Sequence, residues 1–75
     1  MNIERLVQMA NDIAGYFSSE PEHREAVAGV VNHLQKFWDP AMRKQIIAHA
    51  QAGGEGLSDL AQAAVEQLAG ATNIT

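Results

Sequence analysis

Apolar residues recur along the start of the chain with the spacing of an amphipathic helix. Between residues 3 and 17 they fall within an arc of roughly 120° when successive residues are placed 100° apart. These positions are Ile3, Leu6, Val7, Ala10, Ile13, Ala14 and Phe17. Asn2 precedes them and can cap the helix, while Ser18 and Pro21 follow as turn residues. The pattern predicts a helix over residues 3–17.

A second apolar stripe of similar width follows Pro21. Its members are Val27, Val30, Val31, Leu34, Phe37 and Trp38. Ser19 and Glu22 have the spacing of a capping box, and Pro21 suits the first turn of a helix, so we expect this helix to begin there. The short connection makes the two helices antiparallel. We therefore expect the first and second helices to form the self-packed core.

A third helix is predicted from the Asp39-Pro40 pair to about Ala52, because Asp39 can cap it and proline is favoured in its first turn. Its apolar face is thin and consists of Met42, Ile46, Ile47 and Ala50. Arg43 projects at an angle inside that face. This mismatch marks Arg43 as a candidate for a contact outside the core.

A fourth helix is predicted after the glycine-rich run of residues 53–56. Glycine accepts the positive φ at a helix C-terminus, so the run predicts a turn, and Ser58 can cap the helix that follows. The apolar face of this helix holds Leu57, Leu60, Ala61, Ala64, Val65 and Leu68. Gly70 is the predicted stop.

These four segments predict an all-α fold, a small bundle of three to four short helices, because the sequence lacks the period-two alternation of a strand. We expect residues 1–70 to form a single helical domain. Residues 71–75 are expected to be a frayed C-terminal tail.

Composition limits the size of the core. Hydrophobic residues make up 47% of the 75 residues, but 13 of them are alanine and 22 are large. A domain this short buries only about 60% of its unfolded surface, so the core is expected to be marginal unless a partner completes it. No apolar run approaches a membrane span, and the N-terminus lacks the basic start of a secretory signal. The sequence therefore predicts a cytoplasmic protein that does not contact a membrane.

Charge and residue types exclude several classes of function. Nine acidic and five basic residues give a net charge of −4, which argues against nucleic acid as a partner. No cysteine is present, and His23, His33 and His49 lack the i, i+3 or i, i+4 spacing of metal ligands on one helix. No nucleophile–base pair and no phosphate loop is recognisable. We expect no catalytic, cofactor-binding or metal-binding residue in this chain and do not expect an enzyme.

The stretch from Asn32 to Arg43 is the unusual part of the sequence, since it places two aromatic residues and an Asp-Pro turn close together. Trp38 either anchors a contact with another protein or plugs the corner between two helices of this chain. His33 has Gly29 as its neighbour on the helix surface, which suggests either the close approach of another backbone or a tolerated glycine.

The same stretch carries a family resemblance. The residues Asn32-His33-Leu34, Phe37-Trp38-Asp39-Pro40 and Met42-Arg43 resemble the signature N-H-L-x-x-F-W-[D/E]-P-x-M-R of the small delta subunit of molybdenum-containing, NAD-dependent formate dehydrogenases. The flanking segments 9–17 and 53–58 are similar to the first helix and the late glycine-rich turn of that family. The resemblance covers roughly residues 1–70.

This resemblance implies a non-catalytic accessory subunit of a complex that oxidises formate to CO2 with NAD+. The large alpha subunit of such enzymes carries molybdenum bis-guanine-dinucleotide and iron–sulfur clusters, the beta subunit carries FMN and the NAD site, and gamma carries a further cluster. The delta subunit is assigned to assembly and stability of the complex, with cofactor insertion or retention as a further expectation. No cofactor is expected on this chain.

Within that expectation, the predicted partner-binding residues for the alpha subunit are Asn32, His33, Trp38, Met42 and Arg43. Trp38 would fill an apolar pocket of the partner, and Arg43 would meet a carboxylate or carbonyl. Two alternatives stay open. The chain can be a transient assembly chaperone for the apo-enzyme, or a generic helical interaction module that forms a homodimer, and a homodimer is also expected when a delta subunit is isolated.

Overall fold

A computed structural model describes residues 2–72, which form four α-helices. The helices are α1 (Ile3–Phe17), α2 (His23–Phe37), α3 (Pro40–Gln51) and α4 (Asp59–Thr72). Since these residues contain no strand, the predicted all-α bundle is confirmed. None of the helices in this range has both the length and the apolar character needed to span a bilayer.

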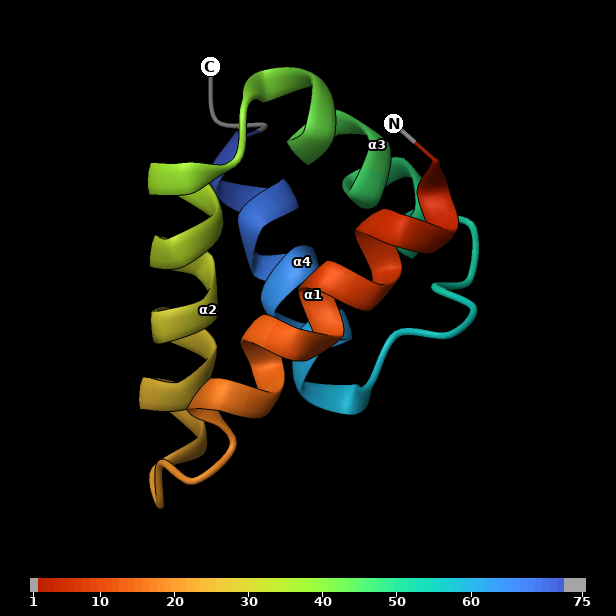
Figure 1. The fold of residues 1–75 in the computed structure, drawn as a ribbon. Coiled ribbons are helices and arrows are strands. Elements are labelled where there is room, and N and C mark those ends of the chain that lie inside the picture. The colour runs from red at the N-terminus through yellow and green to blue at the C-terminus, as the bar shows by residue number, and fades with distance from the viewer. Residues whose placement is uncertain (1, 73–75) are drawn as a thin grey trace.

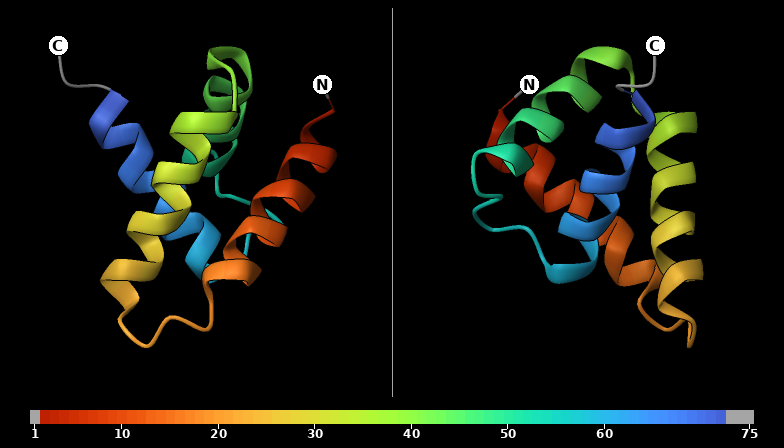
Figure 2. Two further views of the ribbon diagram at one scale, coloured as in Figure 1. Left: turned by 60° about the vertical axis from the view of Figure 1, so that its left-hand side comes forward. Right: turned by 180° about the vertical axis from the view of Figure 1, so that it is seen from behind.

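Two of the four helices, α1 and α2, form a splayed hairpin, and the other two, α3 and α4, pack on it. α1 and α2 meet near the loop of residues 18–22 and diverge away from it, as Figures 1 and 2 show. α4 contacts each of the other three helices and shares its most extensive contact with α2. α3 packs against α1 and α4. The short connection therefore produces the expected hairpin, but the two helices are not packed together along their whole length.

The core is built by all four helices. The largest fully buried side chains are Leu6, Leu34, Ile46, Leu68, Val30 and Val65. Buried alanines on α1 and α4, such as Ala10 and Ala64, let the helices approach closely. The prediction that the first two helices alone form the core is wrong, because α4 and α3 supply half of these six side chains. The Cα radius of gyration is 11.1 Å, close to the value of about 11 Å for a folded domain of this length.

Three helix starts agree with the capping residues predicted from the sequence. The backbone N–H of Glu4 donates to Oδ1 of Asn2 at 2.7 Å, and the N–H of Met42 donates to Oδ1 of Asp39 at 2.9 Å. The N–H of Ala61 donates to Oγ of Ser58 at 3.2 Å. Each bond satisfies a donor that lacks a partner within the first helical turn.

The start of α2 differs from the prediction. The helix begins at His23, with Glu22 in an extended conformation at the cap position and no side-chain cap hydrogen bond, so the Ser19–Glu22 capping box does not form. Instead the chain leaves α1 through a turn in which the N–H of Glu20 donates to the carbonyl of Phe17 at 3.0 Å. Because this turn uses residues 18–20 to stop α1, Ser19 cannot cap α2.

The glycine-rich turn forms as predicted, but the last helix does not end at Gly70. Gly53, Gly54 and Gly56 all have positive φ, of 118°, 66° and 88°. α4 continues through Gly70 to Thr72, so the predicted stop at Gly70 is wrong, while the frayed tail of residues 71–75 remains a prediction. Residues 73–75 of that tail lie outside the described residues.

Candidate interaction surface

The residues predicted to bind a partner do not form one exposed patch. Asn32 is exposed on α2, His33, Met42 and Arg43 are half-buried, and Trp38 is only 4% exposed. Trp38 and Arg43 meet at the corner between α2 and α3, whereas His33 faces α1. Partner binding by these five residues remains a prediction, but they cannot all contribute to one contact through exposed side chains.

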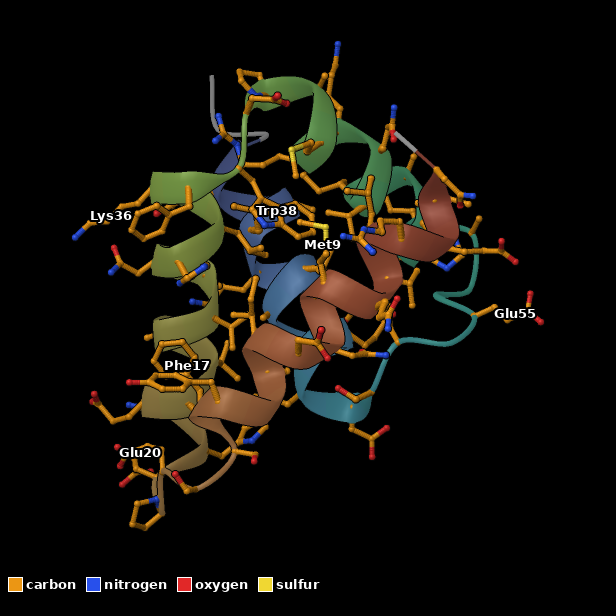
Figure 3. All side chains as sticks on the ribbon, in the orientation of Figure 1. Met9, Phe17, Glu20, Lys36, Trp38 and Glu55 are labelled. Atoms are coloured by element: carbon orange, nitrogen blue, oxygen red, sulfur yellow. The ribbon has the colours of Figure 1, made fainter. Side chains whose placement is uncertain are left out.

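Trp38 lies in the interior of the bundle. Its indole belongs to the buried core cluster that includes Leu6, Leu34 and Ile46, and Met42 packs against this cluster from α3. Figure 3 shows the ring directed between the helices rather than outward. This position agrees with the interpretation in which Trp38 plugs the corner between two helices, and it leaves little of the ring for a pocket on another protein.

Arg43 binds to its own chain. Its Nη1 donates to the backbone carbonyl of Trp38 and, at 3.3 Å, to that of Gln35. Both carbonyls belong to the C-terminal end of α2, where a cation is favoured by the helix dipole and by acceptors that lack an intrahelical donor. The position of Arg43 within an apolar face, which suggested an external contact, is thus explained by the cap that it provides for α2.

Exposed aromatic side chains lie instead on α1, close to the loop that joins it to α2, and at the far end of α2. Tyr16 is 79% exposed and Phe37 is 71% exposed. The ring of Tyr16 lies edge-on to that of Phe17 with centroids 5.0 Å apart, and the ring of His33 lies 4.7 Å from that of Phe37. We refer to Tyr16, Phe17, His33 and Phe37 as the aromatic seam. A contiguous exposed apolar patch marks a protein-binding surface on many proteins, whereas singly exposed rings are ordinary.

The exposure of Phe37 corrects its predicted place in the apolar stripe of α2. Phe37 has the angular position of a core residue, but it lies in the last turn of α2, where α1 has already diverged (Figures 1 and 2). The ring is 71% exposed there and lies against that of His33 one turn earlier, at an interplanar angle of 45°. Periodicity gives the direction of a side chain and not the presence of a neighbour in that direction.

Gly29 makes room for the aromatic seam. A Cβ atom built at Gly29 would lie 2.5 Å from two atoms of the Phe17 ring, which is too close for any real contact. The sequence suggested that a backbone approaches Gly29, whereas the structure places the Phe17 side chain there. Figure 3 shows Phe17 lying over α2. The absence of a side chain at Gly29 thus lets the half-buried Phe17 ring pack directly against α2.

A hollow of about 410 Å³ adjoins the aromatic seam. It is lined by Asp12, Ile13, Tyr16, Phe17 and His33. The first four come from neighbouring positions on one side of α1, since residues three and four apart share a helix face, and His33 comes from α2. The hollow combines aromatic rings with a carboxylate at the surface.

Asn11 joins the first helix to the glycine-rich turn, a contact that the sequence did not reveal. Its Nδ2 donates to the carbonyl of Gly56 at 2.8 Å, and its Oδ1 accepts from the backbone N–H of Ser58, also at 2.8 Å. The side-chain amide therefore matches one donor and one acceptor of the loop. The sequence offers only a weak indication of this contact, which is that Asn11 lies at the edge of the apolar stripe, next in angle to Val7.

The histidines and carboxylates are dispersed. Among the described residues no group of three or more histidine, aspartate or glutamate side chains is placed to hold a metal ion. Nε2 of His49 lies 2.7 Å from the carbonyl oxygen of Glu55, so this ring helps to hold the turn after α3. Within the described range, the aromatic seam is the part of the surface best suited to contact with another molecule.

Comparison with known protein families identifies the family of this chain. A family model described as the NADH-dependent formate dehydrogenase delta subunit, FdsD, matches residues 5–65 of the 75. No curated protein and no solved structure matches the chain. The matched range runs from the first turn of α1 into α4 and includes both partners of the Asn11 contact.

Proposed function

Because the chain belongs to the NADH-dependent formate dehydrogenase delta subunit family, we propose that it is a non-catalytic accessory subunit of such an enzyme. On this proposal the chain binds the large alpha subunit in a cytoplasmic complex that also contains beta and gamma subunits. It supports assembly and stability of that complex, and insertion or retention of the molybdenum cofactor is the finer role to be tested.

The extent of the family match is the observation that carries this proposal. Residues 5–65 include α1 apart from its first two residues, α2, α3 and half of α4, so the family match covers most of the helical unit and not one motif. The Asn11 side chain ties α1 to the turn before α4, which are the two flanks of the matched range. The described bundle is therefore the structural unit to which a delta-subunit role applies.

The proposal assigns the cofactors of the reaction to other subunits. These are molybdenum bis-guanine-dinucleotide, iron–sulfur clusters, FMN and NAD. The chain contains no cysteine, so it cannot supply the thiolate ligands of an iron–sulfur cluster. What it does offer is the aromatic seam, with Tyr16 and Phe37 more than two-thirds exposed, as surface for binding a protein.

Co-expression of the enzyme subunits with and without this chain tests the proposal. The complex is purified through a tag on the alpha subunit, and the content of this chain, the molybdenum per alpha subunit and formate-dependent NADH formation are measured. An accessory subunit should co-elute in a fixed ratio with active enzyme, and its omission should lower the yield or activity of the complex. Normal yield, activity and molybdenum content without it would contradict the proposal.

The same purification separates the accessory subunit from a transient assembly chaperone. A chaperone should be retained by alpha subunit prepared without molybdenum and be absent from the loaded enzyme. Retention by both forms agrees with a stable subunit. The exposed aromatic seam favours self-association of the isolated chain, so the measurement uses the complex and not the chain alone.

A further inference from the structure

The hollow beside the aromatic seam has the features of a site for a planar cation. Asp12 is the one carboxylate in its lining, and no lysine or arginine belongs to that lining. The planes of the Tyr16 and Phe17 rings make an angle of 88°, so the edge of one ring points at the face of the other. Aromatic faces carry negative electrostatic potential and attract cations, and a carboxylate in the same lining adds to this attraction.

We propose that this hollow receives an arginine side chain of the partner subunit, an inference that rests on the proposed function. The guanidinium stacks on the Tyr16 or Phe17 ring and donates hydrogen bonds to the Asp12 carboxylate. Arginine fits better than lysine, because a guanidinium is planar, weakly hydrated and able to stack while it donates in its own plane. Its aliphatic stem lies against Ile13.

One wall of the hollow, the Phe17 ring, is fixed by packing within the chain. Phe17 is held against Gly29 of α2, with no room for even one additional carbon atom between them, and it supports Tyr16 edge-on. His33 is backed by the ring of Phe37. A ring that is already ordered loses little conformational entropy when a ligand binds, and this lowers the free-energy cost of binding a single long side chain.

Charge complementarity supports a basic partner segment. Asp12 lines this hollow, and Glu20 lines an adjoining one together with Tyr16 and Phe17. Of the basic residues on α2 and α3, Arg43 binds the end of α2, and Lys36 precedes Phe37 in the last turn of α2, outside the lining of the hollow. The chain as a whole carries a net charge of −4. The seam is therefore apolar at its centre with carboxylates at one end, and the matching surface is apolar with an arginine.

The first experiment uses the full chain and small probes. N-acetyl-arginine amide is titrated into isotopically labelled protein and followed by NMR, with N-acetyl-citrulline amide as an uncharged probe of nearly the same shape. We expect arginine amide to shift the signals of Tyr16, Phe17 and His33 with an affinity about five-fold higher than that of citrulline amide. Equal affinity of the two probes, or shifts elsewhere only, would overturn the proposal.

A matched pair of variants controls for net charge. Asp12→Asn should reduce the affinity for arginine amide to about that for citrulline amide, while Glu55→Gln makes the same change of charge on the loop, far from Phe17 (Figure 3). An equal effect of both would mean that the probe senses overall charge, which contradicts a site at Asp12. Lysine amide binding as tightly as arginine amide would overturn the choice of arginine.

The second experiment returns to the enzyme complex. Tyr16→Ala, Asp12→Asn and Glu55→Gln variants are each co-expressed with the other subunits. The first two should be retained several-fold less than wild type, while Glu55→Gln is retained normally. If wild type is retained and all variants equal it, the inference fails while the proposed function stands. If wild type itself is not retained, the proposed function fails. A homodimer of the chain that is lost in Tyr16→Ala would show that a second copy covers the aromatic seam instead.

Discussion

The contact made by Asn11 offers a quantitative test of how α1 is joined to the rest of the bundle. Asn11→Ala removes two hydrogen bonds of 2.8 Å, to Gly56 and Ser58. A typical intramolecular hydrogen bond contributes about 0.5–1.5 kcal/mol net. The loop groups that lose their partner are reached by water, so the lower half of that range applies, and the two bonds together contribute about 1–2 kcal/mol. Replacing asparagine by alanine inside a helix returns about 0.5 kcal/mol through helix propensity.

A matched substitution removes the propensity term. Asn32 is exposed in the interior of α2, so Asn32→Ala gains the same helix propensity without touching the loop. Urea unfolding should show Asn11→Ala less stable than Asn32→Ala by about 1–2 kcal/mol, equivalent to roughly 5–15 °C in Tm for a chain of this size. Asn11→Asp, which keeps the acceptor for Ser58 and loses the donor to Gly56, should fall between them. A difference below about 0.5 kcal/mol would refute the view that Asn11 holds the loop.

Three further substitutions test single contacts. Gly54→Ala should destabilise the fold by about 1–3 kcal/mol, because the left-handed backbone disfavours alanine and the new Cβ would lie 1.9 Å from Oε1 of Gln62. In a double-mutant cycle, Gln62→Ala should recover the part of this loss that comes from the steric clash. Additive effects of the two substitutions would contradict the clash. Arg43→Ala should lower the free energy of unfolding, measured in urea, by about 1 kcal/mol through loss of the α2 cap. Arg43→Lys should recover only part of this loss. An Arg43→Ala variant as stable as wild type would refute the cap. Phe37→Ser should change stability by less than about 0.5 kcal/mol while reducing concentration-dependent self-association in sedimentation, and a larger loss of stability would place Phe37 in the core.

Local chemistry made the helix starts predictable. Asn2, Asp39 and Ser58 each bind a backbone N–H within three residues, so the signal and its effect lie in the same short segment. The start of α2 was not predictable in this way, because a turn that closes α1 competes for the same residues. Gly70 failed as a stop since a glycine can continue a helix at a modest cost and needs no positive φ there.

Contacts between distant segments could not be read from the sequence. Asn11 and Ser58 are 47 positions apart, and no periodicity relates them. The exposure of Phe37 depends on how far α1 has diverged from α2 at that turn (Figure 1), and α4 packs against both helices. The periodicity placed Phe37 and Trp38 near opposite edges of one stripe, but only the packing of the other helices determines that Trp38 is 4% exposed and Phe37 71%.

These placements change which substitutions can reveal a partner-binding surface. Trp38→Ala would remove a buried ring and, like other large-to-small core changes, destabilise the fold by about 3–5 kcal/mol, while Arg43→Ala uncaps α2. Loss of the partner by either variant would then report unfolding as readily as lost contact. The small size of the chain suggested that a partner completes its core, yet six large side chains are fully buried without one. A partner is therefore better sought through exposed residues, and Tyr16 and Phe37 can be replaced without opening the core.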